Sequence, residues 1–202
     1  HGSVRLVDAE SKIIARPKLA KRKQEFGLPT IVGDGLVNQP GAFWNRAAME
    51  RAGYLNEDLN YIMDYELWVR MALAGARFKR LDDPPLAMYR LADDTKTVGF
   101  QHKTGLEKLG VLDWLMSDPA LPEKTGLEPE ELARLAQRAR ALASLKVARG
   151  YTHIAGQRLQ ALHWFARAAW MWPPCLMIFP EYLVKRLWVS VATKLGAGPP
   201  TW

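Results

Sequence analysis

The sequence has few of the residues that cross-link small domains or bind metals. Its 202 residues include one cysteine, Cys175, which excludes an internal disulfide framework and a cysteine-based zinc cluster. The four histidines show no spacing typical of metal ligands: His153 and His163 are ten residues apart, which would place them on different faces of a helix. Apolar residues make up 49% of the chain and charged residues 24%, as in globular proteins.

Long hydrophobic runs are also absent. The longest apolar run, residues 168–180, has 13 residues and three prolines, whereas a membrane-spanning helix needs about 20 apolar residues. The first residues, His-Gly-Ser, soon give way to polar sequence and do not resemble a signal peptide. Because the chain does not begin with Met, we expect it to be part of a longer protein or to carry a tag remnant.

Acidic residues are scarce in the last third of the chain. The net charge is +7 and the isoelectric point about 9.6, which favours an anionic partner. Residues 132–202 hold ten basic residues, five of the eight tryptophans and a single acidic residue, Glu181. This pattern is typical of an interfacial membrane surface, and a basic helical bundle with tryptophan in its core fits it equally well. A nucleic-acid partner is not expected, because no recognisable binding motif accompanies the charge.

Periodicity predicts an α+β protein. Alternating or apolar segments predict strands at residues 4–7, 12–14, 42–44, 76–81 and 86–90. The basic segment 15–29 is predicted to be a loop with at most one helical turn, and the glycines of residues 30–41 favour sharp turns. Asn45 and Gly53 mark the ends of a helix over 46–52, and Asp64 and Gly75 those of a helix over 65–74. Leu67, with Met71, Ala74 and the adjoining Trp68, forms the apolar stripe of the second helix.

After residue 100 the pattern becomes helical. We predict helices over residues 104–117, from 128–129 onward, over 159–171 and over 182–195, and no strand. The long helix that opens at Glu128-Pro129 has an apolar face made of Leu132, Leu135, Ala136, Ala139, Leu142 and Ala143.

Five short motifs follow one another in the first hundred residues. They are Gln39–Trp44, Gly53–Glu57, Met63–Arg70, Tyr89–Arg90 and Thr95–Thr97. Each is weak alone, but their order over about 60 residues closely resembles the C-terminal, acceptor-side half of inverting family 2 glycosyltransferases. The resemblance covers residues 3–100.

The resemblance implies a fold and an activity. The expected fold is a partial glycosyltransferase A-type α/β domain over residues 1–100, followed by an all-helical, membrane-associating tail over residues 101–202. The expected enzyme transfers a sugar from a nucleotide-diphosphate sugar to a hydroxyl of a saccharide or lipid-linked acceptor, with inversion. Its expected place is the cytoplasmic face of the membrane, in polysaccharide synthesis for the cell envelope.

The resemblance also assigns roles to single residues. Asp64 corresponds to the family's general base, although aspartate is also a favoured helix N-cap. Trp68 is expected to line the sugar pocket, with a buried core tryptophan as the alternative. Arg70 is expected to anchor a carboxylate or a loop in the binding region, or to lie on the helix surface. The remaining substrate-binding candidates are Gln39, Arg90 and Lys96, the last two near the diphosphate or simply solvated.

Two departures from the family pattern limit what this chain does alone. Ala92 stands where the family has histidine, and the sequence contains no Asp-x-Asp, the family's metal motif. We therefore expect a divalent metal, Mg²⁺ or Mn²⁺, in a full-length parent, and assign no metal ligand here. These 202 residues alone are expected neither to bind nucleotide tightly nor to turn over. The alternative function is a non-catalytic helical module that binds a partner or a membrane surface.

Overall fold

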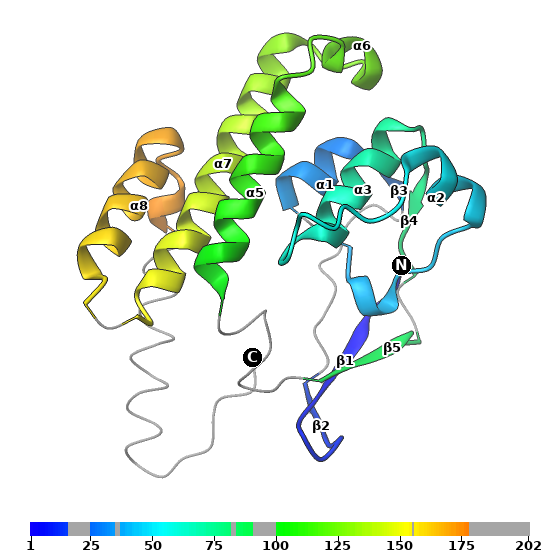
Figure 1. Ribbon diagram of the computed structural model, residues 1–202, viewed down its shortest axis with the longest axis horizontal. Helices are drawn as coiled ribbons and strands as arrows, with labels where there is room; N and C mark the ends of the chain where they lie inside the picture. The colour runs from blue at the N-terminus through cyan, green and yellow to red at the C-terminus, as the bar shows by residue number, and fades with distance from the viewer. Residues whose placement is uncertain (16–24, 35–36, 82–83, 91–99, 155, 178–202) are drawn as a thin grey trace.

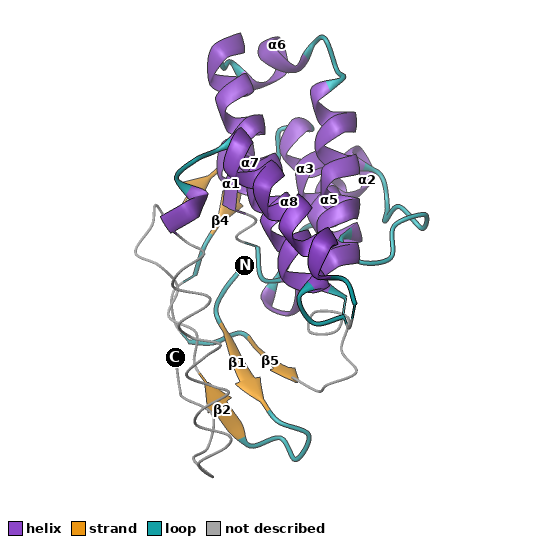
Figure 2. Ribbon diagram, turned by 90° about the vertical axis from the view of Figure 1, so that its left-hand side faces the viewer, coloured by secondary structure: helices purple, strands orange, loops and turns teal. Residues whose placement is uncertain are grey.

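The protein is an α+β structure in which helices predominate, as the sequence predicts (Figure 1). The computed structural model describes residues 1–15, 25–34, 37–81, 84–90, 100–154 and 156–177. Most of the helices gather at one end of the molecule, and a three-stranded sheet lies at the other (Figure 2). No strand occurs after residue 100 in the described part of the chain, in agreement with the prediction.

Two small sheets contain all of the described strands. In the three-stranded sheet, β1 is central, antiparallel to β2 and parallel to β5. In the two-stranded sheet, β3 and β4 are antiparallel. The strands are β1 (Val4–Val7), β2 (Ile13–Ala15), β3 (Glu25–Phe26), β4 (Phe78–Lys79) and β5 (Ala87–Arg90).

The helices form two groups on either side of a long antiparallel pair. This pair, α5 and α7, has α8 on one side and α1, α2 and α3 on the other (Figure 1). The helices are α1 (Leu28–Asp34), the 3-10 helix η1 (Gln39–Gly41), α2 (Arg46–Ala52), α3 (Met63–Leu73), α5 (Gln101–Met116), α6 (Leu121–Thr125), α7 (Pro129–Tyr151) and α8 (Arg158–Met171).

One hydrophobic core joins these helices. Leu67 and Met71 of α3 pack with Ile31 of α1, Leu112 of α5 and Ala139 of α7, and each of these side chains is buried. The apolar stripe predicted for the helix after Asp64 is therefore confirmed. The core contains residues from both sides of the expected boundary near residue 100. The helices after residue 100 therefore support the segment before it, which carries the candidate site.

Helix α1 is a correction to the sequence prediction, which gave a loop here. Leu28, Ile31 and Val32 are buried and recur at helical spacing, with Pro29 in the first turn, where its missing N–H costs nothing. Packing of this face against α3 and α7 outweighs the helix-breaking tendency of Gly33.

The strand predicted over residues 42–44 is wrong. Gly41 is held against the N-terminal segment, where its carbonyl accepts a hydrogen bond of 3.0 Å from the Gly2 N–H, and the chain then runs extended. Phe43 and Trp44 are largely exposed and pair with no strand among the described residues. β4 is also shorter than the predicted 76–81. The predicted helix over 182–195 lies outside the described residues.

Glycines allow α5 and α7 to approach closely. A Cβ atom on Gly150 of α7 would lie 2.2 Å from the backbone nitrogen of His102, and one on Gly105 of α5 would lie 2.8 Å from the carbonyl oxygen of Ala143. Both distances are far shorter than van der Waals contact, so the crossing requires glycine at these two positions. None of the described helices has the length and apolar character needed to cross a membrane.

Replacing Gly150 with alanine is therefore expected to destabilise the protein by about 1–3 kcal/mol, since overpacking forces the helices apart. Gly110→Ala is the matched control on α5, because a Cβ there meets nothing within 4 Å. It is expected to stabilise by about 0.5–1 kcal/mol through helix propensity. Urea unfolding measures both, and equal effects of the two variants would contradict this packing.

Candidate functional site

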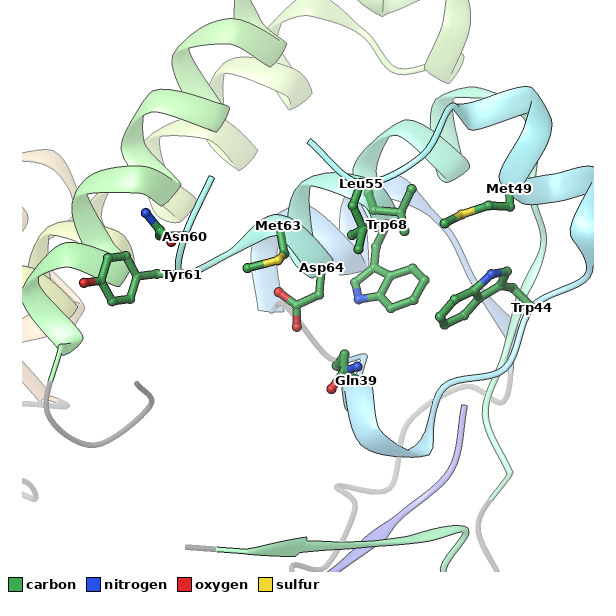
Figure 3. Close-up of a pocket in the computed structure, with 10 residues that line it drawn as sticks. Gln39, Trp44, Met49, Leu55, Asn60, Tyr61, Met63, Asp64 and Trp68 are labelled. Carbon is green, nitrogen blue, oxygen red and sulfur yellow. The ribbon is translucent and has the colours of Figure 1, made fainter. Parts of the chain in front are cut away.

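A cavity of about 320 Å³ lies at the start of α3 (Figure 3). Two tryptophans, several aliphatic side chains, one carboxylate and two amides line it. The lining residues are Gln39, Trp44, Met49, Leu55, Asn60, Tyr61, Met63, Asp64, Leu67 and Trp68. Three of the sequence-predicted site residues, Asp64, Trp68 and Gln39, therefore meet at one place.

Asp64 and Trp68 face the cavity together because they are four residues apart on α3. Asp64 lies in the first turn, where the helix dipole favours a negative charge. The predicted N-cap role is wrong: Ile62 is the N-cap, and the Asp64 carboxylate accepts a hydrogen bond of 2.8 Å from the N–H of the next residue, Tyr65. The carboxylate therefore binds a first-turn N–H from within the helix and not from the N-cap position.

The backbone amides just before α3 are bound by Glu107 of α5. Its carboxylate accepts hydrogen bonds from the N–H groups of Asn60 at 3.0 Å, Tyr61 at 2.8 Å and Ile62 at 3.2 Å. Hydrogen bonds to an ionised acceptor are roughly twice as strong as neutral ones. A residue of the helical segment thus fixes the loop that leads into Asp64. Sequence reasoning missed Glu107, because 45 residues separate it from Ile62.

The surroundings of Asp64 suit a proton acceptor. Burial raises the pKa of the Asp64 carboxyl, whereas the Tyr65 N–H, its own N–H and the positive charge of Lys146 act in the opposite direction. Burial in turn lowers the pKa of the Lys146 ammonium on α7, and Asp64 opposes that change. A carboxylate with a raised pKa is a better base once ionised.

Trp68 is both a core residue and a site residue. Only 4% of it is exposed, and its ring packs edge-on against Trp44 with the centroids 5.3 Å apart. Trp44 is 45% exposed and offers a more accessible aromatic surface. Sequence reasoning missed Trp44 as a site residue because it placed residues 42–44 in a buried strand.

The same two tryptophans line a second, wider hollow of about 710 Å³. Its lining includes the basic side chains Arg51, Arg77 and Lys79 and the largely exposed Phe43. The smaller cavity is the candidate site, because it contains the carboxylate.

Arg70 is not among the residues that line the smaller cavity. Its guanidinium pairs with Glu66 at 2.6 Å, also donates to the Ala52 carbonyl, and donates to the Tyr54 carbonyl at 2.7 Å. The pair is poorly exposed, at 18% for Arg70 and 7% for Glu66. Arg70 thus anchors a carboxylate and the loop after α2, as one of the sequence hypotheses proposed, and holds that loop beside the site.

The other two basic candidates do not join the cavity either. Arg90 of β5 donates to the Asp8 carbonyl at 2.9 Å, to the Ala9 carbonyl, and to the Ser11 hydroxyl at 3.0 Å. It therefore holds the turn between β1 and β2, where Ser11 has a positive φ of 67°. Lys96 lies outside the described residues.

The residues around the cavity do not fit a metal ion. Within the described ranges, no three His, Cys, Asp or Glu side chains come together in a way that would hold one. Glu66, two residues from Asp64, is engaged by Arg70. The chemistry of the cavity is therefore that of a lone carboxylate among aromatic and amide groups.

Burial of Asp64 predicts a characteristic pH dependence of stability. The pKa of the Asp64 carboxyl is raised in the folded state, so the unfolded chain loses this proton at a lower pH. The free energy of unfolding therefore falls as the pH rises from about 3.9, the ordinary aspartate pKa, to the raised pKa of the folded state. Asp64→Asn cannot ionise. Its melting temperature relative to wild type is therefore expected to improve between about pH 4 and pH 7, as measured by thermal denaturation.

Asp118→Asn is the control with the opposite sign. A hydrogen bond from Lys124 holds the pKa of Asp118 below its usual range. Ionisation of this carboxyl therefore increases the free energy of unfolding of the wild type as the pH rises. The variant should therefore lose ground on the wild type below about pH 4, as the pH rises from the lowered native pKa to the ordinary value, and follow the wild type between about pH 4 and pH 7. Parallel trends for the two variants would contradict the burial of Asp64.

The Arg70–Glu66 pair predicts a large structural effect of a single substitution. Arg70→Ala leaves a buried carboxylate unpaired and is expected to cost about 3 kcal/mol of unfolding free energy. Arg46→Ala breaks a pair of the same spacing with Glu50 whose side chains are 88% and 47% exposed, and should cost under about 0.5 kcal/mol. Equal losses in urea unfolding would show that Arg70 has no such anchoring role.

Comparison with known proteins adds no assignment to this geometry. No protein-family model, no curated protein and no solved structure matches the chain. The function of the cavity is therefore argued from its own residues and from the order of the motifs.

Proposed function

We propose that this chain is the acceptor-side part of an inverting glycosyltransferase of the hexosyltransferase type. In this proposal the cavity at the start of α3 takes the sugar acceptor, saccharide or lipid-linked, at the cytoplasmic face of a membrane. The observation that carries it is the convergence of the partly buried Asp64 carboxylate with Trp44, Trp68 and Gln39 in one cavity. These residues belong to the motifs that resemble the family.

The size and lining of the cavity support a small hydroxylated ligand. A volume of about 320 Å³ falls at the lower end of the range of small-molecule sites, about 300–1,000 Å³. Sugars present apolar C–H faces and hydroxyl groups, and the cavity offers aromatic surfaces together with a carboxylate and amides. The lining thus suits both the apolar faces and the hydroxyl groups of a sugar.

The proposed step is a single in-line displacement. The acceptor hydroxyl gives its proton to the Asp64 carboxylate as its oxygen forms a bond to the anomeric carbon of the donor sugar. The bond from that carbon to the nucleotide diphosphate breaks, and the diphosphate leaves with the electron pair. Asp64 is held for this role by α3 and by the loop that Glu107 clamps. The donor is bound by a nucleotide-binding half that the longer parent supplies.

Asp64→Asn in the protein that carries this chain and its nucleotide-binding half is expected to reduce sugar transfer by about 10²–10⁴-fold, because the general base is lost. Transfer of radiolabelled sugar from a nucleotide-diphosphate sugar to saccharide acceptors measures this, with circular dichroism as the check on folding. Asp113→Asn, which alters an exposed carboxylate on α5, is the control and should leave transfer unchanged. Full activity of the Asp64 variant would remove the catalytic role.

The outer face of α8 favours a second candidate function, binding to an anionic membrane surface. Leu159, Leu162 and Trp170 are 80%, 62% and 87% exposed on this helix, and Met177 follows at 82%. The sequence from residue 132 to 180 contains no acidic residue. Exposed apolar side chains in a wholly non-acidic segment suit the interface of an anionic bilayer.

The double change Leu159→Ser and Trp170→Ser is expected to weaken binding to anionic phosphatidylserine vesicles at least tenfold, because each side chain would bury apolar surface worth about 1.5–3 kcal/mol. Trp114→Ser is the control, because it removes an exposed tryptophan, 47% accessible, from α5 and leaves the outer face of α8 unchanged. Co-sedimentation with vesicles measures the binding. An equal loss in the control, or equal binding to neutral phosphatidylcholine vesicles, would oppose this candidate.

A further inference from the structure

The indole N–H of Trp68 is a buried hydrogen-bond donor that lacks a partner among the described residues. Such groups are rare in folded proteins, because an unsatisfied buried donor loses its hydrogen bond to water and gains none in return. Its nitrogen lies on the side of the ring that faces the Asp64 carboxylate and the Gln39 amide (Figure 3). The unpaired donor therefore faces the part of the cavity that Asp64 and Gln39 line.

A donor and an acceptor that face the same small space define the group that fits between them. The ionised Asp64 carboxylate only accepts hydrogen bonds, and the Trp68 N–H only donates. A hydroxyl group satisfies both at once, because it donates through its proton and accepts through its oxygen. The Gln39 amide is able to do either and adds a third contact.

Charged groups fit this space poorly. Among the described residues that line the cavity there is no lysine, arginine or histidine, and Lys146, whose charge acts on Asp64 from α7, is not one of them. A carboxylate or phosphate on the ligand would therefore face the Asp64 carboxylate with no cation in the lining to bind it. An ammonium group would pair with Asp64, but it has no lone pair to accept the Trp68 N–H. The arrangement thus selects a neutral hydroxyl over both kinds of ion.

We propose that Trp68 is a specificity-determining donor, which hydrogen-bonds the oxygen of the ligand hydroxyl whose proton points to Asp64. The inference rests on the proposed function, because the hydroxyl in question is the acceptor nucleophile of the transfer reaction. It adds that the ligand is a neutral sugar residue. Trp68 acts through its N–H, and the apolar wall is provided by the more exposed ring of Trp44, which packs against it. This role is more specific than the lining of the sugar pocket that the sequence analysis expected for Trp68.

The test uses the full 202-residue chain and methyl glycosides of neutral hexoses. Binding is followed by NMR at the indole N–H signal of Trp68, which is assigned by its absence from the spectrum of Trp68→Phe. In the wild type this signal is expected to move downfield as the sugar is added, because the hydrogen bond forms. Replacing Trp68 with benzothienylalanine keeps the ring shape and removes only the donor. Affinity should fall about tenfold, the value of one hydrogen bond. The same replacement at the exposed Trp114 should change nothing.

Three outcomes would overturn the inference: unchanged affinity on removing the donor, no movement of the Trp68 signal, or no binding of any neutral glycoside. Equal binding of methyl glucuronide, which carries a carboxylate, would overturn the assignment of a neutral ligand. Failure of the proposed function is seen separately, in the transfer assay. If Asp64→Asn leaves transfer intact while donor removal weakens binding, the neutral ligand and the role of Trp68 stand, and only catalysis by Asp64 is rejected.

Discussion

The start of α3 depends on a carboxylate that another helix supplies. Glu107 of α5 accepts hydrogen bonds from three backbone N–H groups of the loop before α3. The helix that carries Asp64 and Trp68 is therefore held by the helical segment and by the shared core. For this reason the helical part of the chain belongs to the architecture of the site, whatever else its outer face does.

Helix α3 uses two of its faces for different purposes. Asp64 and Trp68 face the cavity, while Glu66 and Arg70, with the same spacing, lie buried against the loop after α2. The first pair leaves the Trp68 N–H without a partner among the described residues, and the second satisfies its charges internally. Groups that a fold leaves unsatisfied in a cavity are the ones available to a ligand, which is why the proposals rest on Asp64 and Trp68.

Local signals in the sequence predicted local structure well. The Asn45 cap and Gly53 stop delimit α2, Gly75 follows the end of α3, and the apolar faces of α3 and α7 are buried as predicted. The sequence failed where distant contacts decide the outcome. Helix α1 forms because α3 and α7 bury it, and the amides just before α3 are bound by Glu107 of the distant helix α5. Asp64, Trp68 and Gln39 were selected from the motifs as site residues. Trp44, although it ends the first motif, was not, because the sequence predicted a buried strand there.

The central claim is that Asp64 presents a partly buried carboxylate to a sugar hydroxyl. The most direct measurement is the ¹³C titration of its side-chain carboxyl in the labelled chain, with and without a neutral methyl hexoside. The account predicts a midpoint above that of an exposed aspartate, since burial raises this pKa, and a change in the midpoint when the sugar binds. A midpoint at the ordinary value that is unaffected by saturating sugar would contradict it.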